Sequence, residues 1–382
     1  MYFDNAATTK PSKEVIADIT WCLENVWGNP SSIYSEGIKA KQILEQSREK
    51  VAKYINAEPD EIIFCSSGSE ANNLAIKGFL AVNNIYDCII TTQTEHPSVY
   101  NVCMHLFENE YYKIGFAPVD KTGKVNVTRF KQLISELSYF NYCFTSIMMA
   151  NNEIGTINDI KKIVEIAHHH TGIVHTDATQ VIGQIPVDVK ELDCDMLTFS
   201  GHKLGLPRGT GILYKKKDIH LSPIIHGGQQ EWNLRAGTEN LANIYALGNQ
   251  LERLSNKEYP SNETRDYLYN KICEKCELLN IEVKLNGDLI DRLPNNLSLT
   301  FKGINAEALI TLLDMRNVYV SAGSACSSGN PEPSRILKAI GLTDEEAFNT
   351  IRISLNANTT IDECDEFVKV LCECLESLKM IL

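Results

Sequence analysis

Segments with helical spacing of apolar residues alternate with short apolar runs from about residue 12 to residue 250. Helical spacing follows Pro11 and recurs at 40–55, 129–137 and 160–168, and a further helix is expected at about 240–254. Strand-like runs lie at 61–65, 88–92, 143–150, 173–176, 196–199 and 211–214. Because strands that alternate with helices form βαβ units, this pattern predicts an α/β fold with a mainly parallel sheet.

The pattern changes after a polar stretch at 255–263, which combines a proline with unpatterned polar residues. Beyond it, strands are expected at 296–301, 318–320 and 350–355, and helices at 307–314, 334–339 and 361–378. This mixture is typical of a smaller α+β domain. We predict a large domain at 12–256 and a small domain that combines 1–11 with 257–382.

Composition and charge narrow the function classes. Of 382 residues, 43% are hydrophobic, and 36 basic against 49 acidic side chains give a net charge of −13 without a basic block, which disfavours nucleic acid as a partner. No apolar run approaches the length of a membrane span, and the N-terminus does not resemble a signal peptide, so a cytoplasmic location is expected. The twelve cysteines suggest reduced thiols, and 273–276 and 372–374 lack the paired halves of a zinc site, so no metal is expected.

Polar residues follow five of the expected strands. Ligands bind outside the carboxyl ends of the strands in an open parallel sheet, so these positions are the first candidates for chemistry. They comprise a small-residue loop that leads into a helix (Ser66, Ser67, Gly68, Ser69, Glu70), an imidazole (His96), an amide (Asn152), a carboxylate and an amide (Asp177, Gln180), and a hydroxyl, an imidazole and a lysine (Ser200, His202, Lys203).

This set of groups matches a pyridoxal phosphate site. The loop before the helix is suited to a phosphate, Lys203 to covalent attachment of the cofactor, Asp177 to the protonated ring nitrogen, and His96 to stacking on the ring. Each residue by itself is more often a helix cap or a solvated side chain. Their joint occurrence, in order along the sheet, favours the cofactor.

Nine motifs carry a resemblance to the cysteine desulfurases of the class V aminotransferase family, in the order of that family. They are DNAATT at 4–9, GNPSS at 28–32, SGSEANNLAIKG at 67–78, TEHPSV at 94–99, NNEIGT at 151–156, HTDATQ at 175–180, SGHK at 200–203, GGQQEWNLRAGTEN at 227–240 and GSACSSG at 323–329. The resemblance extends from residue 4 to about residue 360. It implies the fold-type I architecture of pyridoxal phosphate transferases, with a seven-stranded sheet in the large domain.

The resemblance also implies roles for individual residues. Lys203 carries the cofactor, His96 stacks on its ring, and Gly68, Ser69, Ser200 and His202 hold its phosphate. Asn152 and Gln180 contact the ring hydroxyl side, with Asn152 also near the substrate. Thr238 contacts the phosphate across a homodimer interface, and Arg352 binds the carboxylate of the substrate, a task suited to a planar bidentate donor.

Cys326 differs from the other cysteines, because glycine and serine surround it and deny it an apolar face. A small residue in a turn would fit the same spacing. Within the resemblance, however, Cys326 corresponds to the nucleophile that receives sulfur, and the segment that follows resembles the long-loop branch, in which the cysteine can reach an acceptor protein.

We therefore expect an enzyme that converts L-cysteine to L-alanine and forms a persulfide on Cys326. The persulfide would pass to an acceptor for iron–sulfur cluster assembly or for thiolation of tRNA or a cofactor. Selenocysteine cleavage or another pyridoxal phosphate reaction of class V aminotransferase type stays open, because a fold does not fix a reaction. A non-catalytic iron–sulfur assembly protein is an alternative of another class.

Overall fold

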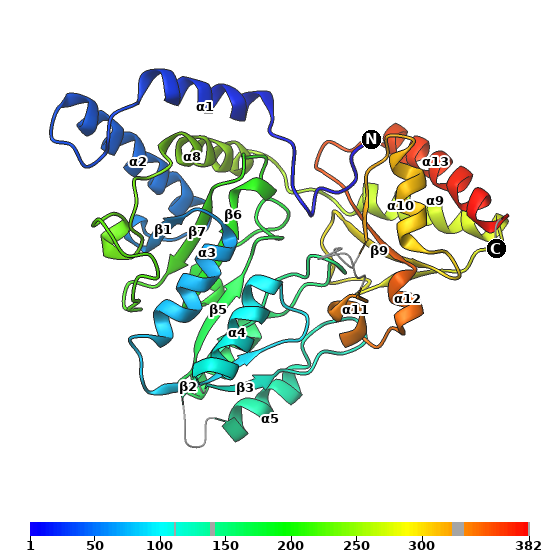
Figure 1. Cartoon of the computed structure of the whole chain (residues 1–382), viewed down its shortest axis with the longest axis horizontal. Helices are drawn as coiled ribbons and strands as arrows, with labels where there is room; N and C mark the ends of the chain where they lie inside the picture. Colours follow the sequence, from blue (N-terminus) through cyan, green and yellow to red (C-terminus); the bar gives the residue numbers. More distant parts are fainter. Residues whose placement is uncertain (111, 138–141, 323–331, 381–382) are drawn as a thin grey trace.

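The protein forms a large lobe and a smaller lobe, each built around its own sheet (Figure 1). The computed structural model describes residues 1–110, 112–137, 142–322 and 332–380. The large lobe contains a seven-stranded sheet and the small lobe a four-stranded sheet. The N-terminus lies beside the small lobe, and the chain then passes between the lobes into the first helix.

The large sheet has the strand order β1-β7-β6-β5-β4-β2-β3. Its strands are β1 (Ile62–Cys65), β2 (Tyr86–Thr91), β3 (Lys113–Phe116), β4 (Tyr142–Ser146), β5 (Ile173–Asp177), β6 (Met196–Ser200) and β7 (Gly211–Lys215). Neighbouring strands from β3 to β6 are parallel, and β7 is antiparallel to β6 and β1. The carboxyl ends of β1, β2, β4, β5 and β6 therefore lie at one edge of the sheet, as the sequence predicts.

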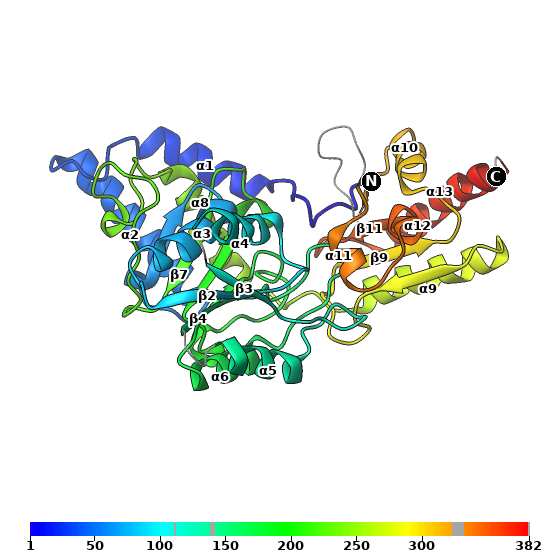
Figure 2. The same cartoon turned by 60° about the horizontal axis from the view of Figure 1, so that its bottom comes forward.

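Helices cover both faces of this sheet (Figure 2). They are α1 (Lys13–Asn25), α2 (Ser35–Tyr54), α3 (Gly68–Asn73), α4 (Pro97–Glu110), α5 (Val127–Leu137), α6 (Ile160–His169), α7 (Val189–Leu192) and α8 (Leu241–Ser255), with a π-helical turn at Leu74–Gly78 and 3₁₀ turns at Pro59–Glu61, Gly201–Lys203 and Glu231–Asn233. Alternate strand residues face opposite sides. Ile63, Ile89 and Phe144 pack with α3 and α4, whereas Ile62 and Ile90 pack with the core formed by α1, α2, α5, α6 and α8.

The small lobe packs three of its helices, α9, α10 and α13, on one face of an antiparallel sheet. Its strands are β8 (Val283–Asn286), β9 (Asn296–Phe301), β10 (Ser321–Ala322) and β11 (Thr350–Ser354), in the order β10-β11-β9-β8, and its helices are α9 (Glu263–Leu278), α10 (Ala306–Asp314), α11 (Arg335–Ala339), α12 (Asp344–Phe348) and α13 (Ile361–Lys379). Leu297, Leu299, Phe301, Ile351 and Ile353 pack with α9, α10 and α13.

The opposite face of the small sheet is polar and still buried. Ser298 and Thr300 on β9 and Thr350, Arg352 and Ser354 on β11 alternate with the apolar residues and have little exposed surface. This face meets the loop that follows β4, where the Arg352 guanidinium donates a hydrogen bond to the carbonyl oxygen of Asn152. A polar layer thus separates the cores of the two lobes.

The predicted α/β class and the mainly parallel seven-stranded sheet are confirmed. The predicted strand at 318–320 is wrong, because the pairing with β11 is made by Ser321 and Ala322. The strands β3 and β8 and the helices α4, α7 and α12 were not among the predicted elements, and of α9 only a helical pattern around 273–276 was expected. We propose that the predicted domain limits apply. The packing of Phe3 in the core of the small lobe supports the assignment of residues 1–11 to the small domain.

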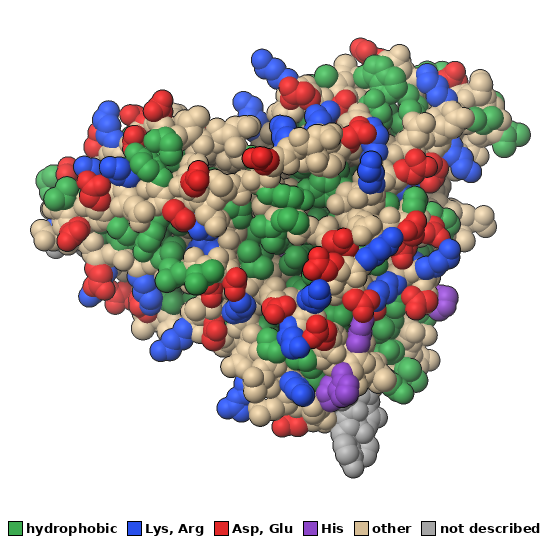
Figure 3. Space-filling view, turned by 180° about the vertical axis from the view of Figure 1, so that it is seen from behind, with side chains coloured by type: hydrophobic (Ala, Val, Ile, Leu, Met, Phe, Trp, Pro, Cys, Tyr) green, Lys and Arg blue, Asp and Glu red, His purple; other side chains and the backbone are tan. Residues whose placement is uncertain are grey.

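Surface features agree with the balance of charges. On the face shown in Figure 3, the described acidic and basic side chains are interspersed, without a large basic patch. Among the described helices, none is both long enough and apolar enough to cross a bilayer.

A buried ion pair fixes the loop at 225–240 against the large sheet. Both terminal nitrogens of Arg48 contact the Glu231 carboxylate at 2.8 Å, and the Phe64 amide donates to the same carboxylate at 2.9 Å. The guanidinium also stacks on the ring of Trp232 at 4.5 Å. Glu231, Trp232 and Asn233 all have positive φ, a conformation that is costly without such support.

We expect Arg48→Leu to lower the free energy of unfolding by about 3–5 kcal/mol, because it leaves the Glu231 charge buried and unpaired. Urea denaturation would measure this loss. The double variant Arg48→Leu/Glu231→Leu should be less destabilised, because it removes both charges. An equal or greater loss in the double variant would contradict this account.

Candidate active site

The loops after the parallel strands meet the start of β7 at one edge of the large sheet, the edge formed by the carboxyl ends of the parallel strands. The first residues of α3 lie against β7: a Cβ atom added to Gly211 would come within 2.1 Å of the Ser67 backbone. A glycine is therefore required there, and it lets the chain before α3 approach the sheet closely. Ser67 caps the helix by accepting a hydrogen bond from the Glu70 amide at 3.1 Å.

The start of α3 forms a small polar pocket. A Cβ on Gly68 would lie 3.4 Å from Ser200 and 3.5 Å from Thr179, so these residues surround a space next to a helix N-terminus. The hydroxyl of Thr210 is buried there without a hydrogen-bond partner among the described residues. Such a cluster of small residues, hydroxyls and amide hydrogens is suited to an anion.

A chain of hydrogen bonds connects His96 to Asp177. The Asp177 carboxylate is buried and accepts from the side chain of Asn72 at 2.8 Å and from the Thr179 amide at 2.9 Å. The Asn72 amide also donates to Ser98 at 2.8 Å, and the Ser98 hydroxyl lies 2.7 Å from Nδ1 of His96. Two predicted site residues are thus held in place by Asn72 and Ser98, which the sequence analysis did not identify as site residues.

The pKa of both imidazoles of the site is lowered. His96 lies at the opening, where loss of water lowers the pKa of its ring, and its Nδ1 accepts a hydrogen bond from the Ser98 amide at 3.1 Å. Burial and the charge of Lys203 lower the pKa of His202 to about 4. The His202 ring lies 3.2 Å from the hydroxyl of Thr8.

The N-terminal segment is hydrogen-bonded to Lys203 and to the loops around it. The Lys203 amine donates to the carbonyl oxygens of Ala6 at 2.5 Å and Ala7 at 2.6 Å. Gln180 donates to the same Ala6 oxygen at 3.2 Å. The hydroxyl of Thr9 donates to the backbone of His202 at 2.8 Å, so the segment contacts both the β5 and the β6 loops.

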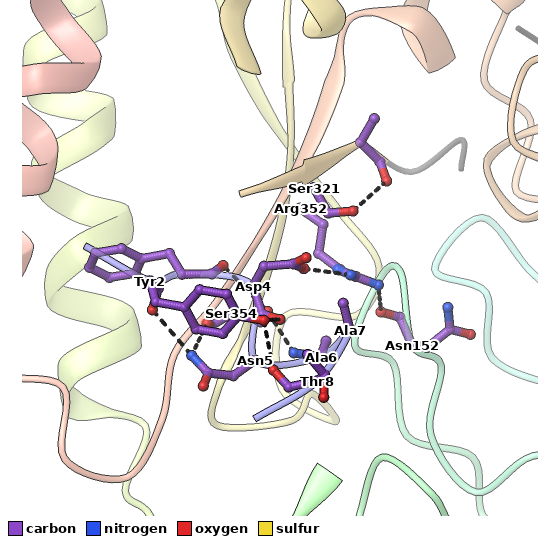
Figure 4. Close-up of polar contacts among 12 residues, drawn as sticks. Tyr2, Asp4, Asn5, Ala6, Ala7, Thr8, Asn152, Ser321, Arg352 and Ser354 are labelled. Carbon is purple, nitrogen blue, oxygen red and sulfur yellow. Dashed lines mark hydrogen bonds and ion pairs between the residues drawn. The ribbon is translucent and has the colours of Figure 1, made fainter. Parts of the chain in front are cut away.

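Arg352 enters the site from the small lobe, as Figure 4 shows. Its guanidinium donates to the carbonyl oxygen of Asn152 at 2.9 Å and forms an ion pair with Asp4 at 2.7 Å. Two polar atoms next to these contacts, Nε of Arg352 and Oδ1 of Asn152, are buried without a partner among the described residues. The structure therefore brings Asn152 and Arg352 together.

A buried glutamate and a partly buried one lie next to these residues. Burial raises the pKa of Glu95, next to His96, to about 8 and the pKa of Glu153, next to Asn152, to about 7. Glu95 accepts from the amide of Met148 at 3.0 Å, and Glu153 accepts from the hydroxyl of Ser334 at 2.5 Å.

Arg335 connects the start of α11 to the turn that carries His96. Its guanidinium donates to the carbonyl oxygens of Gln93 and Glu95 and stacks on the ring of Tyr100 at 3.8 Å. Positive charge from the small lobe is thus placed beside the loop after β2 as well as beside the loop after β4.

The remaining predicted site residues are placed differently. Ser69 is exposed on the first turn of α3 and lines a cavity of about 390 Å³ with His96. Thr238 is also exposed, and it lines a cavity of about 260 Å³ with Ser66 and Thr210. Cys326 lies outside the described residues.

Comparisons with known proteins agree with this geometry. Residues 1–367 match the family model for class V aminotransferases. The chain is 41% identical to the cysteine desulfurase IscS of Clostridium botulinum strain Hall, over 97% of this chain and 93% of that protein, and 40% identical to the enzyme of the same name from Dictyoglomus turgidum, over 100% and 96%.

The fold is similarly matched by a solved NifS-like protein, with a TM-score of 0.89 and 33% identity over 99% of this chain and 100% of that one. A structure of SspA in complex with cysteine matches with a TM-score of 0.80 and 33% identity, over 94% and 99%. The chain therefore belongs to the cysteine desulfurases of the class V aminotransferase family.

Proposed function

We propose that this enzyme takes the sulfur from L-cysteine, leaves L-alanine, and carries the sulfur as a persulfide on Cys326. The observation that supports this most strongly is that Lys203, Asp177 and Arg352 come together at one edge of the large sheet. A similar structure was determined in complex with cysteine, which supports the choice of substrate.

The residues at this edge fit pyridoxal phosphate. We propose that Gly68, Ser69, Ser200 and His202 hold the phosphate, because the pocket at the start of α3 has space, hydroxyls and amide hydrogens. Asp177 would hold the ring nitrogen, and Lys203 would attach the cofactor. His96 would lie against the ring, and Asn152 and Gln180 would contact its hydroxyl side.

The protein supplies binding and proton transfer around the cofactor. When bound, pyridoxal phosphate supplies an electron sink that makes the Cα proton of an amino acid easier to remove. Arg352 binds the carboxylate of L-cysteine, for which its planar fork is suited. Lys203 then accepts the Cα proton as a general base, and Asp177 keeps the ring nitrogen protonated.

The sulfur step requires a thiolate on Cys326. It forms a bond to the substrate sulfur as the bond between that sulfur and the substrate Cβ breaks. The electron pair of the broken bond stays with Cβ, which takes up a proton and becomes the methyl group of L-alanine, while the transferred sulfur is oxidised to the persulfide level. Overall, the Cys326 thiol and L-cysteine would give a persulfide and L-alanine, so no outside oxidant or reductant is needed. We propose an acceptor protein of iron–sulfur cluster assembly or of tRNA or cofactor thiolation, and a cytoplasmic location.

Two alternatives are less well supported. A non-catalytic assembly protein has no need for a partly buried lysine beside a buried aspartate and a buried arginine. Selenocysteine cleavage uses the same geometry, since its substrate is nearly isosteric with L-cysteine, and comparison of the two substrates would separate the activities.

We also propose a homodimer. Several large apolar side chains around α1 and α2 are exposed, including Trp27 at 71% and Ile33 at 93%. A second copy would cover them, as exposed apolar patches of this kind often mark interfaces. Thr238 is exposed near the same edge as the phosphate pocket, which agrees with a contact to the site of the partner.

Cys326→Ser should abolish formation of L-alanine from L-cysteine, because a serine hydroxyl cannot accept the sulfur as a persulfide. Cofactor binding should persist, since the thiol is needed only after proton removal. Alkylation and mass spectrometry should map the added sulfur of the unaltered enzyme to Cys326. The matched control Cys372→Ser, which removes a partly exposed thiol on α13, should stay active; sulfur found first on Cys372 would overturn the assignment.

Lys203 of the cofactor-free protein should react with an amine-acetylating reagent with a midpoint near pH 8. Burial and the charge of Arg352 lower the pKa of the Lys203 amine from 10.5 to about 8, and only the neutral amine is nucleophilic. Reactivity should therefore rise as the pH passes this value, which mass spectrometry of the Lys203 peptide would measure. Arg352→Gln should move the midpoint upward, and a midpoint near 10.5 in the unaltered protein would contradict the assignment.

Ile33→Glu should convert the dimer to a monomer in light scattering, because it places a charge in the proposed interface. The control Ile290→Glu changes an apolar residue of similar exposure, 84%, far from α1 and α2 in the sequence, and should leave the dimer intact. A monomeric parent protein, or equal effects of both variants, would exclude this interface.

A further inference from the structure

The Asp4 carboxylate binds the Arg352 guanidinium, which we assign to the carboxylate of the substrate. Oδ1 of Asp4 lies 2.7 Å from Nη2 of Arg352, although the two residues are 348 positions apart in the chain. Figure 4 shows the two side chains pointing toward each other from the N-terminal segment and from β11. A carboxylate of the protein is thus present where a carboxylate of the substrate is expected.

This contact does not involve all the hydrogen-bond donors of the Arg352 guanidinium. Nη1 of Arg352 donates to the carbonyl oxygen of Asn152, whereas its Nε hydrogen is buried without a partner in the described part of the chain. Arginine binds carboxylates best through two parallel hydrogen bonds. Asp4 makes one such bond, so a free amino acid that presents both oxygens would make a stronger contact.

Burial differs between the two partners. The side chain of Arg352 is 8% exposed and that of Asp4 is 19% exposed. Among the described residues, Arg352 is also the only hydrogen-bond partner of the Asp4 carboxylate. Asp4 can therefore return to water at lower cost than Arg352, which has to keep a counter-charge in its buried position.

Two carboxylates at one guanidinium repel each other, and Asp177 adds a third negative charge near the same centre. A substrate carboxylate on Arg352 therefore favours departure of Asp4. When the product leaves, Asp4 returns to Arg352, because its carboxylate then supplies the counter-charge that the buried guanidinium requires.

We propose that Asp4 exchanges with the carboxylate of the bound amino acid on Arg352 and thereby sets the affinity of the site for both L-cysteine and L-alanine. The proposal rests on the proposed function, which assigns Arg352 to the substrate carboxylate. Its consequence is weaker binding of both amino acids and faster release of L-alanine than an unopposed arginine would allow.

Lys203 lies close to the same ion pair. Asp4 belongs to the same segment as Ala6 and Ala7, whose carbonyl oxygens accept hydrogen bonds from the Lys203 amine. The negative charge of Asp4 raises the pKa of Lys203. The substrate carboxylate that replaces Asp4 on Arg352 brings its own negative charge, so a negative charge stays near Lys203 throughout the exchange.

Asp4→Asn tests the proposal, because asparagine keeps the shape of the side chain and removes its charge. Binding of L-alanine and of ethylamine, which is L-alanine without its carboxylate, is measured on the cofactor-loaded enzyme by calorimetry. We expect the dissociation constant of L-alanine to fall at least about five-fold, since a charge-assisted contact in a partly buried site no longer competes. The dissociation constant of ethylamine should not change.

The control Tyr2→Phe removes the hydroxyl that donates to the carbonyl oxygens of Thr8, at 2.8 Å, and Asp4, at 3.1 Å, but it keeps the Asp4 charge. It should not tighten L-alanine binding. Weaker or unchanged binding of L-alanine by Asp4→Asn would overturn the proposal and make Asp4 a support for Arg352, and equal tightening of ethylamine would also overturn it. Failure of the unaltered enzyme to form L-alanine from L-cysteine would instead contradict the proposed function.

Discussion

The contacts of residues 3–9 hold the two halves of the site at a fixed distance. Phe3 packs in the core of the small lobe, and the backbone of Ala6 is bonded to the hydroxyl of Ser354 at 2.8 Å. Three residues further on, Thr9 is bonded to the loop that carries Lys203. This short segment therefore helps to hold Arg352 on one lobe near Lys203 on the other, as the proposed function requires.

The electrostatic balance of the site depends on the same arrangement. Arg352 and Lys203 are cations with little water around them, and Asp4 and Asp177 lie close enough to offset their charge. Burial alone would favour the neutral lysine, while the aspartates favour the charged one. Because Asp4 belongs to the connecting segment, its position affects the surroundings of both the Arg352 guanidinium and the Lys203 amine.

Sequence patterns were sufficient for the sheet and for most of the residues at its edge. The strands β5 and β6 are short apolar runs, and Asp177 and Lys203 follow from the rule that ligands bind at strand ends. Strand β3 is harder to detect, since it is an edge strand of four residues with an exposed lysine. Helix α9 has no clear apolar stripe, because charged residues surround its few buried positions.

The residues that the sequence analysis missed are those whose role depends on distant contacts. Asn72 is one polar residue among several in α3, and only the fold shows that its amide donates to Asp177, 105 residues away. Asp4 lies in a motif that the resemblance identified, yet its pairing with Arg352 requires the N-terminal segment to lie along β11. Periodicity reports which face of an element is buried, but it does not report which polar groups meet across two lobes.

The two ends of the segment that contains Cys326 are attached to different lobes. Ser321 and Ala322 pair with β11 in the small sheet, whereas Ser334 is bonded to Glu153 in the loop after β4. Arg335 adds bonds to the loop after β2. The polar boundary between the lobes, where several buried polar atoms have no hydrogen-bond partner in the part of the chain that the structure describes, thus also lies between these two attachments. If Cys326 takes sulfur from the substrate, as we propose, the described residues on either side of its segment are therefore fixed to the two lobes that together form the candidate site.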